Sequence, residues 1–321
     1  MTSTISAPRN SEQNEVPAAT GTRGGPPSFS MIPGEEVIRR PARALIGWMS
    51  EPEALTALLG RNPIPTDDLG SFRSMAAAAR RSVEALPRRP FDSAVVDDAD
   101  PQLASTQSRE DVAANFPGLD WRAAFVDLRK VISFQKIIAV DGLEDRLAGA
   151  ASSAGLLDLC VPPTQPAHPL GAFNDPDQKG FTIASTNPNL RVAGAQVGAA
   201  EVSPQPGTPT VRMQAVTFLV HMGTSYLQVV EYRGRSFVRD GYHRAAGLLR
   251  RGITTVPCIY ITAQSFEQVG LVPGSFTYES LFGDHPPFVS DFWDNSVSAD
   301  IEIPAVRKIV RVRAEEFVVS R

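Results

Sequence analysis

Apolar side chains recur at helical spacing through the first part of the chain. Three apolar pairs fall on a helical period: Val37-Ile38, Leu45-Ile46 and Trp48-Met49. Ser50 and Glu53 then have the spacing of a capping box, which opens a further helical segment that Gly60 ends. An alanine-rich segment with arginines on one side, residues 67–86, predicts a surface helix.

Two shorter helices are predicted before residue 130. Ser108 with Asp111 caps the first, and Asp120 caps the second. The second has one apolar stripe, formed by Trp121, Ala124, Phe125 and Leu128. Residues 31–130 are therefore predicted to form a mainly helical region.

β-branched and aromatic residues become frequent from residue 131 onward. The run 131–140 is the first clear strand signal, and a short helix is predicted near 143–151. Residues 162–188 are rich in Pro, Asn, Asp and Gly, which predicts a long surface loop with one strand at 181–183. The second half of the chain is therefore expected to be α/β.

A β-meander followed by a helix is predicted over residues 211–261. Its strands are expected at 211–220, 226–232 and 235–238, with a turn at Arg233-Gly234. Helical spacing then covers 242–250, Gly252 is suited to the residue after the helix, and 256–261 has strand composition. This is the most regular pattern in the chain.

The last strand signal places arginines and valines in alternation. Arg311 and Arg313 alternate with Val310 and Val312, which predicts a half-exposed strand. Its arginines either form an ordinary solvated edge or bind a chain of phosphates. The fold class expected for residues 131–321 is an α/β (α+β) domain that ends in this strand.

Composition narrows the class of protein. Hydrophobic residues make up 42% of the chain and charged residues 21%. This is enough apolar material for a hydrophobic core that needs no disulfide or metal cross-links. The net charge of −4 argues against a protein that coats DNA, so nucleic acid is not expected as a partner beyond a local contact. The strong preference for arginine over lysine reflects either codon choice in a GC-rich, bacterial-type genome or the fit of guanidinium to phosphate.

The N-terminal residues and the cysteines indicate the compartment. Residues 1–30 contain few large apolar side chains and are predicted to be a disordered leader. They lack the pattern of a signal peptide, and no apolar run reaches membrane-spanning length. Cys160 and Cys258 have no spacing typical of a zinc site or a disulfide framework. A cytoplasmic protein without membrane contact is expected.

The strongest chemical signal is the sequence Arg-Asp-Gly-Tyr-His-Arg at 239–244. A strand, an Asp-Gly turn and a helix in succession aim the first N–H groups of the helix out of the sheet, where they favour an anion. Gly241 allows close approach of the ligand, Arg244 supplies a two-pronged donor, and His243 supplies a donor or proton carrier. The alternative is structural, with Asp240 as a helix cap beside solvated first-turn residues.

Residues 226–261 resemble the ParB/sulfiredoxin superfamily. In that superfamily a strand enters a Gly-x-x-Arg turn, an alanine-rich helix follows, and a Gly and a Val-Pro precede the next strand. The matching residues are Gly241, Arg244, Ala245-Ala246, Gly252 and Val256-Pro257. The resemblance implies a mixed sheet with helices.

The resemblance also implies roles for residues of the turn. Gly241, Tyr242, His243 and Arg244 would belong to a nucleotide-binding turn, with His243 and Arg244 at the phosphates, and Asp240 and His243 would be the catalytic candidates. Asp240 would have a metal or proton role. Tyr242 stands where sulfiredoxins have their catalytic cysteine, so sulfinic reductase activity is not expected.

The function expected from these features is binding of a nucleotide or a phosphorylated small molecule. ATP or CTP with Mg²⁺ is the expected cofactor, and phosphoryl transfer or hydrolysis is one outcome; whether the protein is an enzyme stays open. The metal ligands are not identified by any spacing. The alternatives are a non-catalytic interaction protein that docks a protein partner through its helical N-terminal half, and a ParB-like nuclease. No helix-turn-helix follows Ile261, so a partition-protein role is not expected.

Overall fold

The structure describes most of the chain, apart from both ends and several internal segments. The computed structural model describes residues 38–60, 69–141, 147, 152–163, 171–174, 180–185, 190–202, 211–305 and 308–313. The predicted leader at 1–30 lies outside these residues. All but one residue of the helix expected near 143–151 also lies outside them.

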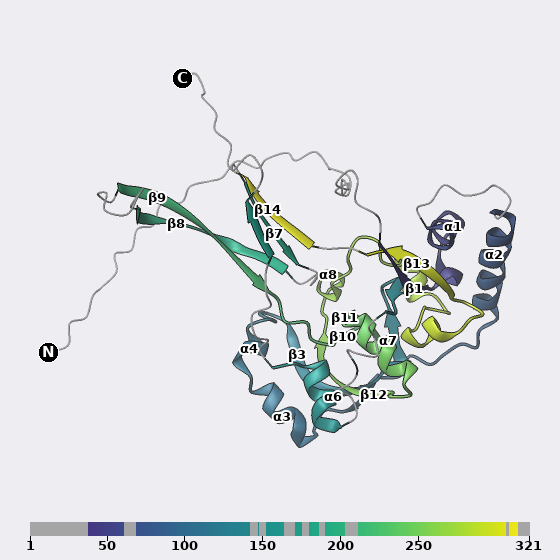
Figure 1. The fold of residues 1–321 in the computed structure, drawn as a ribbon. Helices are drawn as coiled ribbons and strands as arrows, with labels where there is room; N and C mark the ends of the chain where they lie inside the picture. The colour runs from purple at the N-terminus through teal and green to yellow at the C-terminus, as the bar shows by residue number, and fades with distance from the viewer. Residues whose placement is uncertain are drawn as a thin grey trace. The chain divides into compact units, whose positions relative to one another are not determined.

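A six-stranded mixed sheet leads into the predicted site, because its strand that ends at Asp240 is followed by the turn and helix of that site (Figure 1). Its strands, in spatial order, are β2 (Val95–Asp97), β3 (Asp120–Asp127), β12 (Thr255–Thr262), β10 (Gln228–Tyr232), β11 (Arg235–Asp240) and β4 (Val131–Ser133). β12 is antiparallel to β3 and parallel to β10, while β11 is antiparallel to β10 and parallel to β4. Six consecutive residues of β12 are buried, as expected for a strand with neighbours on both sides.

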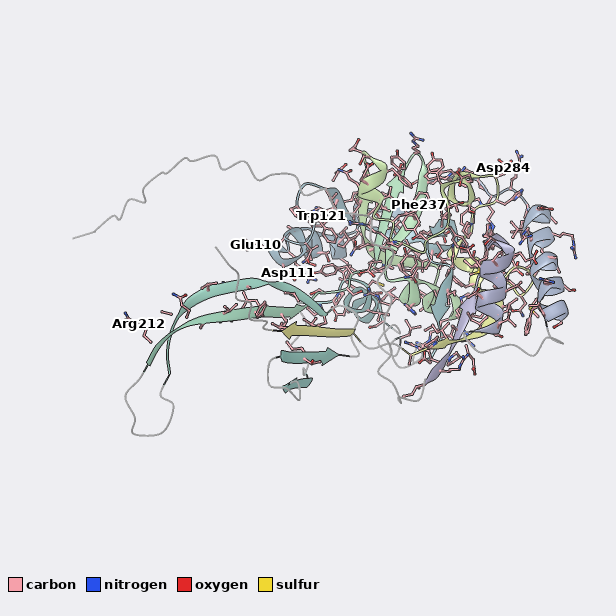
Figure 2. All side chains as sticks on the ribbon, turned by 90° about the horizontal axis from the view of Figure 1, so that it is seen from above. Glu110, Asp111, Trp121, Arg212, Phe237 and Asp284 are labelled. Carbon is pink, nitrogen blue, oxygen red and sulfur yellow. The ribbon has the colours of Figure 1, made fainter. Side chains whose placement is uncertain are left out.

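The core extends through both faces of this sheet. Phe237, labelled in Figure 2, is fully buried and stacks on Phe134 with ring centroids 4.9 Å apart. Helices pack on the strands: α6 on β12, α3 on β3, and α8 on β10. The helices are α1 (Glu51–Leu59), α2 (Leu69–Ala85), α3 (Pro101–Gln107), α4 (Glu110–Ala113), α6 (Ser153–Cys160), α7 (Tyr242–Arg250), α8 (Phe266–Val269) and α9 (Tyr278–Phe282), with 3₁₀ turns η1 (Ile46–Trp48), η2 (Leu128–Lys130) and η4 (Val289–Trp293).

A second sheet joins segments from both ends of the described chain. β1 (Arg39–Ala44) lies between β13 (Ala299–Pro304) and β5 (Ile137–Ala139), antiparallel to both. The Arg43 guanidinium in β1 is buried, and its Nε donates to the carbonyl oxygen of Phe292 at 2.8 Å. A buried cation is tolerated here because several acceptors surround it.

Two smaller sheets complete the described elements. β14 (Lys308–Arg313) and β6 (Gly171–Asn174) flank β7 (Gly180–Ser185), antiparallel to it on both sides. β8 (Leu190–Val202) and β9 (Val211–Met222) form a two-stranded antiparallel ribbon (Figure 1). Among the described residues, no helix is long and apolar enough to cross a membrane.

The structure confirms the α+β class and several predicted elements. Glu53 accepts a hydrogen bond from the N–H of Ser50 at 3.0 Å at the start of α1, as the capping box requires. The surface helix expected at 67–86 is α2, and the helix expected at 242–250 is α7. Local signals sufficed for these elements because each has a cap, a turn or an uninterrupted run of good formers. The confirmed strands are β10, β11, β12 and β14.

Other predictions were wrong, and tertiary pairing explains each error. The segment that begins at Asp120 is strand β3 and not a helix, because it pairs with β12 along eight residues. Residues 39–44 likewise form β1, and only η1 keeps a helical turn there. The described part of residues 31–130 contains more helix than strand, but three strands also lie in it, and two of these pair with strands that follow residue 130.

Two β predictions also differ in detail. The expected single strand in the loop 162–188 is a pair, β6 and β7. The strand expected at 211–220 is part of β9, which pairs with β8 and does not join the β10–β11 hairpin. A strand's composition identifies the strand but not its partner, because partners are chosen by long-range packing.

A buried ion pair connects the segment after α2 to η4. The Asp291 carboxylate is 2% exposed and accepts from Arg89 Nη2 at 2.5 Å and from the N–H of Phe288 at 2.9 Å. Burial raises the pKa of Asp291 above its usual value in spite of these donors. The Arg89 guanidinium also lies over the Phe288 ring, 4.6 Å from its centroid.

Removing the arginine of this pair should destabilise the protein. Arg89→Ala leaves the Asp291 carboxylate buried without its cation, so we expect the free energy of unfolding to fall by about 3 kcal/mol. Arg88→Ala is the matched control, because the Arg88–Asp284 pair is exposed and should contribute less than about 1 kcal/mol. Urea denaturation measures both. Equal losses in the two variants would contradict the role of burial.

Candidate functional site

The predicted site lies where β11 passes into α7. β11 ends at Asp240, and Gly241, the N-cap residue before α7, has the left-handed conformation with φ of +87°. Asp240 Oδ1 accepts from the N–H of Gly241 at 2.7 Å, and its Oδ2 accepts from the Ser225 hydroxyl at 3.3 Å. The carboxylate thus fixes the turn that the sequence predicted.

Gly241 is required here by its conformation and by its neighbour. A Cβ atom added to Gly241 would lie 2.8 Å from Leu227 Cδ1 and 3.1 Å from Leu227 Cα. The second contact is with backbone and cannot be relieved by a rotamer change. The glycine therefore lets the loop that contains Leu227 pack directly on the turn.

The Arg244 guanidinium donates to the protein itself. Its Nη1 donates to the carbonyl oxygens of Leu159 at 2.9 Å and Ser225 at 2.8 Å, and its Nη2 donates to the Ser225 hydroxyl at 2.7 Å. Because Ser225 also donates to Asp240, a continuous hydrogen-bonded chain joins the end of α6, the loop before β10 and the first turn of α7. Arg244 thus connects α7 to the end of α6 and to the loop before β10, and its contact with a phosphate stays a prediction.

The two residues between Gly241 and Arg244 differ in their surroundings. Tyr242 is buried in the core, and burial raises the pKa of its hydroxyl well above its usual value. Its ring is therefore directed into the protein and not toward solvent. His243 is half-buried in the first turn of α7. Their predicted roles toward a nucleotide stay predictions.

Arg239 is a candidate that sequence reasoning did not select. The register shifts beside it: Asp240 lies opposite Gln228 and Val238 opposite Val229, which leaves Arg239 as the extra residue of a β-bulge. Its Nη1 donates to Gln228 Oε1 at 3.3 Å, and no carboxylate among the described residues forms an ion pair with it.

The Arg239 side chain is half-buried and packs on the Gly270 backbone. Burial lowers its pKa, but a guanidinium stays charged in proteins. Within the described part of the chain its side-chain acceptor is a neutral amide, and the charge of the neighbouring Asp240 acts on it without a direct ion pair. A half-buried cation in this setting favours an added anion. No sequence signal could have revealed it, because the bulge is visible only in the strand register.

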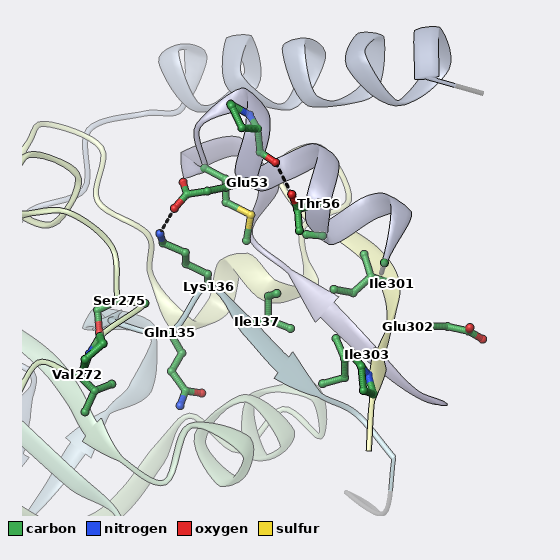
Figure 3. A pocket seen from close by; sticks show the side chains of 17 residues that line it. Glu53, Thr56, Gln135, Lys136, Ile137, Val272, Ser275, Ile301, Glu302 and Ile303 are labelled. Atoms are coloured by element: carbon green, nitrogen blue, oxygen red, sulfur yellow. Dashed lines mark hydrogen bonds and ion pairs between the residues drawn. The ribbon is translucent and has the colours of Figure 1, made fainter. Parts of the chain in front are cut away.

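A separate cavity of about 620 Å³ lies between α1, β13, the turn at 135–137 and the loop 272–275 (Figure 3). Ile137, Ile301 and Ile303 are among its lining residues. At its rim the Lys136 ammonium donates to Glu53 Oε1 at 2.6 Å. The described residues that line this cavity include none of the predicted site residues.

No metal centre is apparent in the described residues, where no group of three or more His, Cys, Asp or Glu side chains is arranged to hold an ion. Comparison of the chain with protein-family models, with curated proteins and with solved structures finds no match in any of the three. The geometry of the turn is therefore the feature that indicates a function.

Substitution of Gly241 should lower the free energy of unfolding by more than the strain of a left-handed conformation alone. Gly241→Ala adds a backbone clash to the cost of a positive φ, and we expect a loss of about 2 to 3 kcal/mol in the free energy of unfolding. Gly252→Ala is the control: Gly252 has φ of +77° but open space around a Cβ, so a loss of about 1 kcal/mol is expected. Denaturant titration compares them, and equal losses would argue against the Leu227 contact.

The Glu53–Lys136 pair should make stability depend on pH. The hydrogen bond from Lys136, with that from the Ser50 N–H, lowers the pKa of Glu53 from 4.5 to about 2. Because the folded pKa lies below the unfolded one, the stabilisation is complete above about pH 4.5 and is lost as the pH falls toward 2. The effect is about 1 kcal/mol or less, since the carboxylate is half-exposed.

Urea midpoints measured from pH 5 down to pH 2 test this dependence. Glu53→Gln and Lys136→Gln should both flatten the decline, because each removes the bond that lowers the pKa. A decline as steep in both variants as in the parent protein would assign the acid sensitivity to other carboxylates.

Proposed function

We propose that the protein binds a phosphate-bearing ligand, a nucleotide above all, at the Asp240-Gly241 turn. The observation that carries the proposal is Arg239, a half-buried cation in a β-bulge immediately before the turn, without an acidic ion-pair partner among the described residues. Bulges often re-aim a side chain beside a functional site. The proposal replaces Arg244 with Arg239 as the principal phosphate donor.

The nine-residue helix α7 adds to the attraction. Its N-terminus carries the positive end of the helix dipole, and it begins directly after Gly241. The succession of β11, a Gly-x-x-Arg turn, α7 and β12 also supports the proposal, since the ParB/sulfiredoxin superfamily uses this order for phosphate contacts.

Asp240 and His243 are the candidates for chemistry beyond binding. The Asp240 carboxylate would hold Mg²⁺ against the phosphates, and His243 would carry a proton in phosphoryl transfer or hydrolysis. Asp240 directly precedes Gly241, and His243 lies in the first turn of α7. Tyr242 contributes packing, because its side chain is buried.

A non-catalytic interaction protein is the second candidate. It is favoured by Arg244, whose guanidinium is already bonded to two carbonyl oxygens and a hydroxyl. In this alternative the turn is a structural joint and a protein partner binds elsewhere. Nucleotide binding separates the two candidates.

Equilibrium dialysis with labelled ATP, CTP and GTP, each with and without Mg²⁺, tests the proposal. The loss of a charge-assisted phosphate contact costs about 1.5 to 3 kcal/mol, so Arg239→Gln should raise the dissociation constant by roughly 10- to 100-fold. Arg250→Gln is the control, because Arg250 lies in the last turn of α7 and is exposed. It should bind like the parent protein.

Two outcomes would contradict this proposal. Absence of binding by the parent protein to every nucleotide at millimolar concentration would favour the interaction protein. Nucleotide binding that Arg239→Gln does not weaken would remove Arg239 from the site and restore Arg244 as the donor to test.

A further inference from the structure

The cavity beside α1 has a floor formed by one face of the second sheet. Ile301 pairs with Ala42 of β1, and Ile137 pairs with Ala44, two residues further along the same strand. Residues two apart along a strand point to the same face, so Ile137, Ile301 and Ile303 share one face of this sheet. All three line the cavity (Figure 3).

The walls of the cavity are also mainly aliphatic. Met49 lies just before α1 and Ala57 lies within it, and both are buried. Val272 contributes from the loop 272–275 and is 58% exposed. The described residues that line the cavity include no aromatic ring on which a nucleobase could stack. This surface therefore favours a ligand with an aliphatic body, because removal of apolar surface from water drives the association.

One cation borders this aliphatic surface. The Lys136 side chain is 15% exposed, and its ammonium lies 5.6 Å from the centroid of the Phe276 ring. Glu53 Oε1 accepts a hydrogen bond from the ammonium at 2.6 Å, and no further acceptor for it lies in the described part of the chain. An ammonium has three N–H donors, so donors remain for an oxygen of a ligand.

The charges around the cavity favour an uncharged ligand. Lys136 and Glu53 already balance each other, and Glu302, the other charged residue of the described lining, is exposed and therefore screened by water and salt. A carboxylate ligand would bring a second anion beside Glu53, and an ammonium ligand would bring a second cation beside Lys136. A neutral oxygen accepts from the ammonium without disturbing this balance.

We propose that this cavity binds a neutral aliphatic molecule that carries one polar oxygen, such as a ketone, an ester or an alcohol. The aliphatic chain packs on the three isoleucines of the floor, and the oxygen accepts from Lys136. The volume of about 620 Å³ is typical of small-molecule sites, and at about 30 Å³ for each atom of the size of a water molecule it has room for roughly 20 of them. The site is separate from the Asp240-Gly241 turn, which contributes no residue to the described lining.

Isothermal titration calorimetry of the full chain with 2-nonanone, nonanoate and nonylamine tests the proposal. These probes have the same number of carbon atoms and differ in charge. We expect 2-nonanone to bind once per chain with a dissociation constant on the order of 10 to 100 µM. Nonanoate and nonylamine should bind about tenfold more weakly or worse, because each adds an unbalanced charge.

A substitution in the wall locates the bound probe. Val272→Asp replaces part of the aliphatic wall with a carboxylate and should weaken 2-nonanone binding by about fivefold or more. Val96→Asp is the matched control, because Val96 is also 58% exposed and lies in β2, outside the lining. It should bind like the parent protein. Circular dichroism of each variant verifies that the fold is intact.

A substitution of the cation tests the oxygen contact. Lys136→Met keeps an unbranched side chain but removes the donor, so 2-nonanone should bind about tenfold more weakly. The same change leaves the Glu53 carboxylate without its cation, so nonylamine should now bind more tightly than 2-nonanone. A loss of packing alone would not reverse this preference. Lys130→Met is the control, because Lys130 does not line the cavity.

Four results would overturn the proposal. Absence of 2-nonanone binding at millimolar concentration would show that the cavity holds no such ligand, and equal weakening by the two aspartate variants would place the probe elsewhere on the protein. Tighter binding of nonanoate than of 2-nonanone by the parent protein would assign the cavity to an anion. An unchanged order of the three probes in Lys136→Met would remove Lys136 from the site.

Discussion

The backbone groups of the buried strand β12 must all form hydrogen bonds within the protein, and this requirement determines which strands lie beside it. Six of its residues are buried in succession, so its backbone N–H and C=O groups cannot be satisfied by water. β3 satisfies one side along eight residues, and β10 satisfies part of the other. The position of β10 then sets that of β11, and with it the place where Gly241 turns the chain into α7.

The candidate site divides its polar groups between structure and binding. Arg244, Ser225 and Asp240 are linked to one another and to the end of α6, which holds the turn in place. Arg239, one residue before the turn, has a neutral amide as its side-chain acceptor. A preorganised anion site needs a rigid backbone beside a cation that can still accept a negative partner. The hydrogen-bonded turn provides the first, and Arg239 provides the second.

The abundance of arginine has a structural use in this protein, whatever its genomic origin. A guanidinium has five donors in a fixed plane and can satisfy several carbonyl oxygens at once. Five half-buried or buried arginines of the described residues donate to backbone carbonyls of other segments: Arg43, Arg80, Arg109, Arg235 and Arg244. Several of the acceptors, among them the carbonyl oxygens of Leu159, Leu281 and Phe292, lie in the last turn of a helix, where no intrahelical donor follows. A lysine, with its single nitrogen, would leave some of those carbonyls unsatisfied.

The sequence by itself determined the elements whose signals are local. The capping box at Ser50, the hairpin turn at Arg233-Gly234 and the glycine before α7 were all predictable, because each depends on the conformation of a few neighbouring residues. The tertiary structure alone decided that Asp120–Asp127 is a strand. Its hydrogen bonds with β12 favour the strand, although the apolar residues of this segment have helical spacing. It also decided that Arg244 points inward and that Arg239 forms no ion pair with a carboxylate of the described residues, since both facts depend on residues distant in the sequence and on a one-residue shift in strand register.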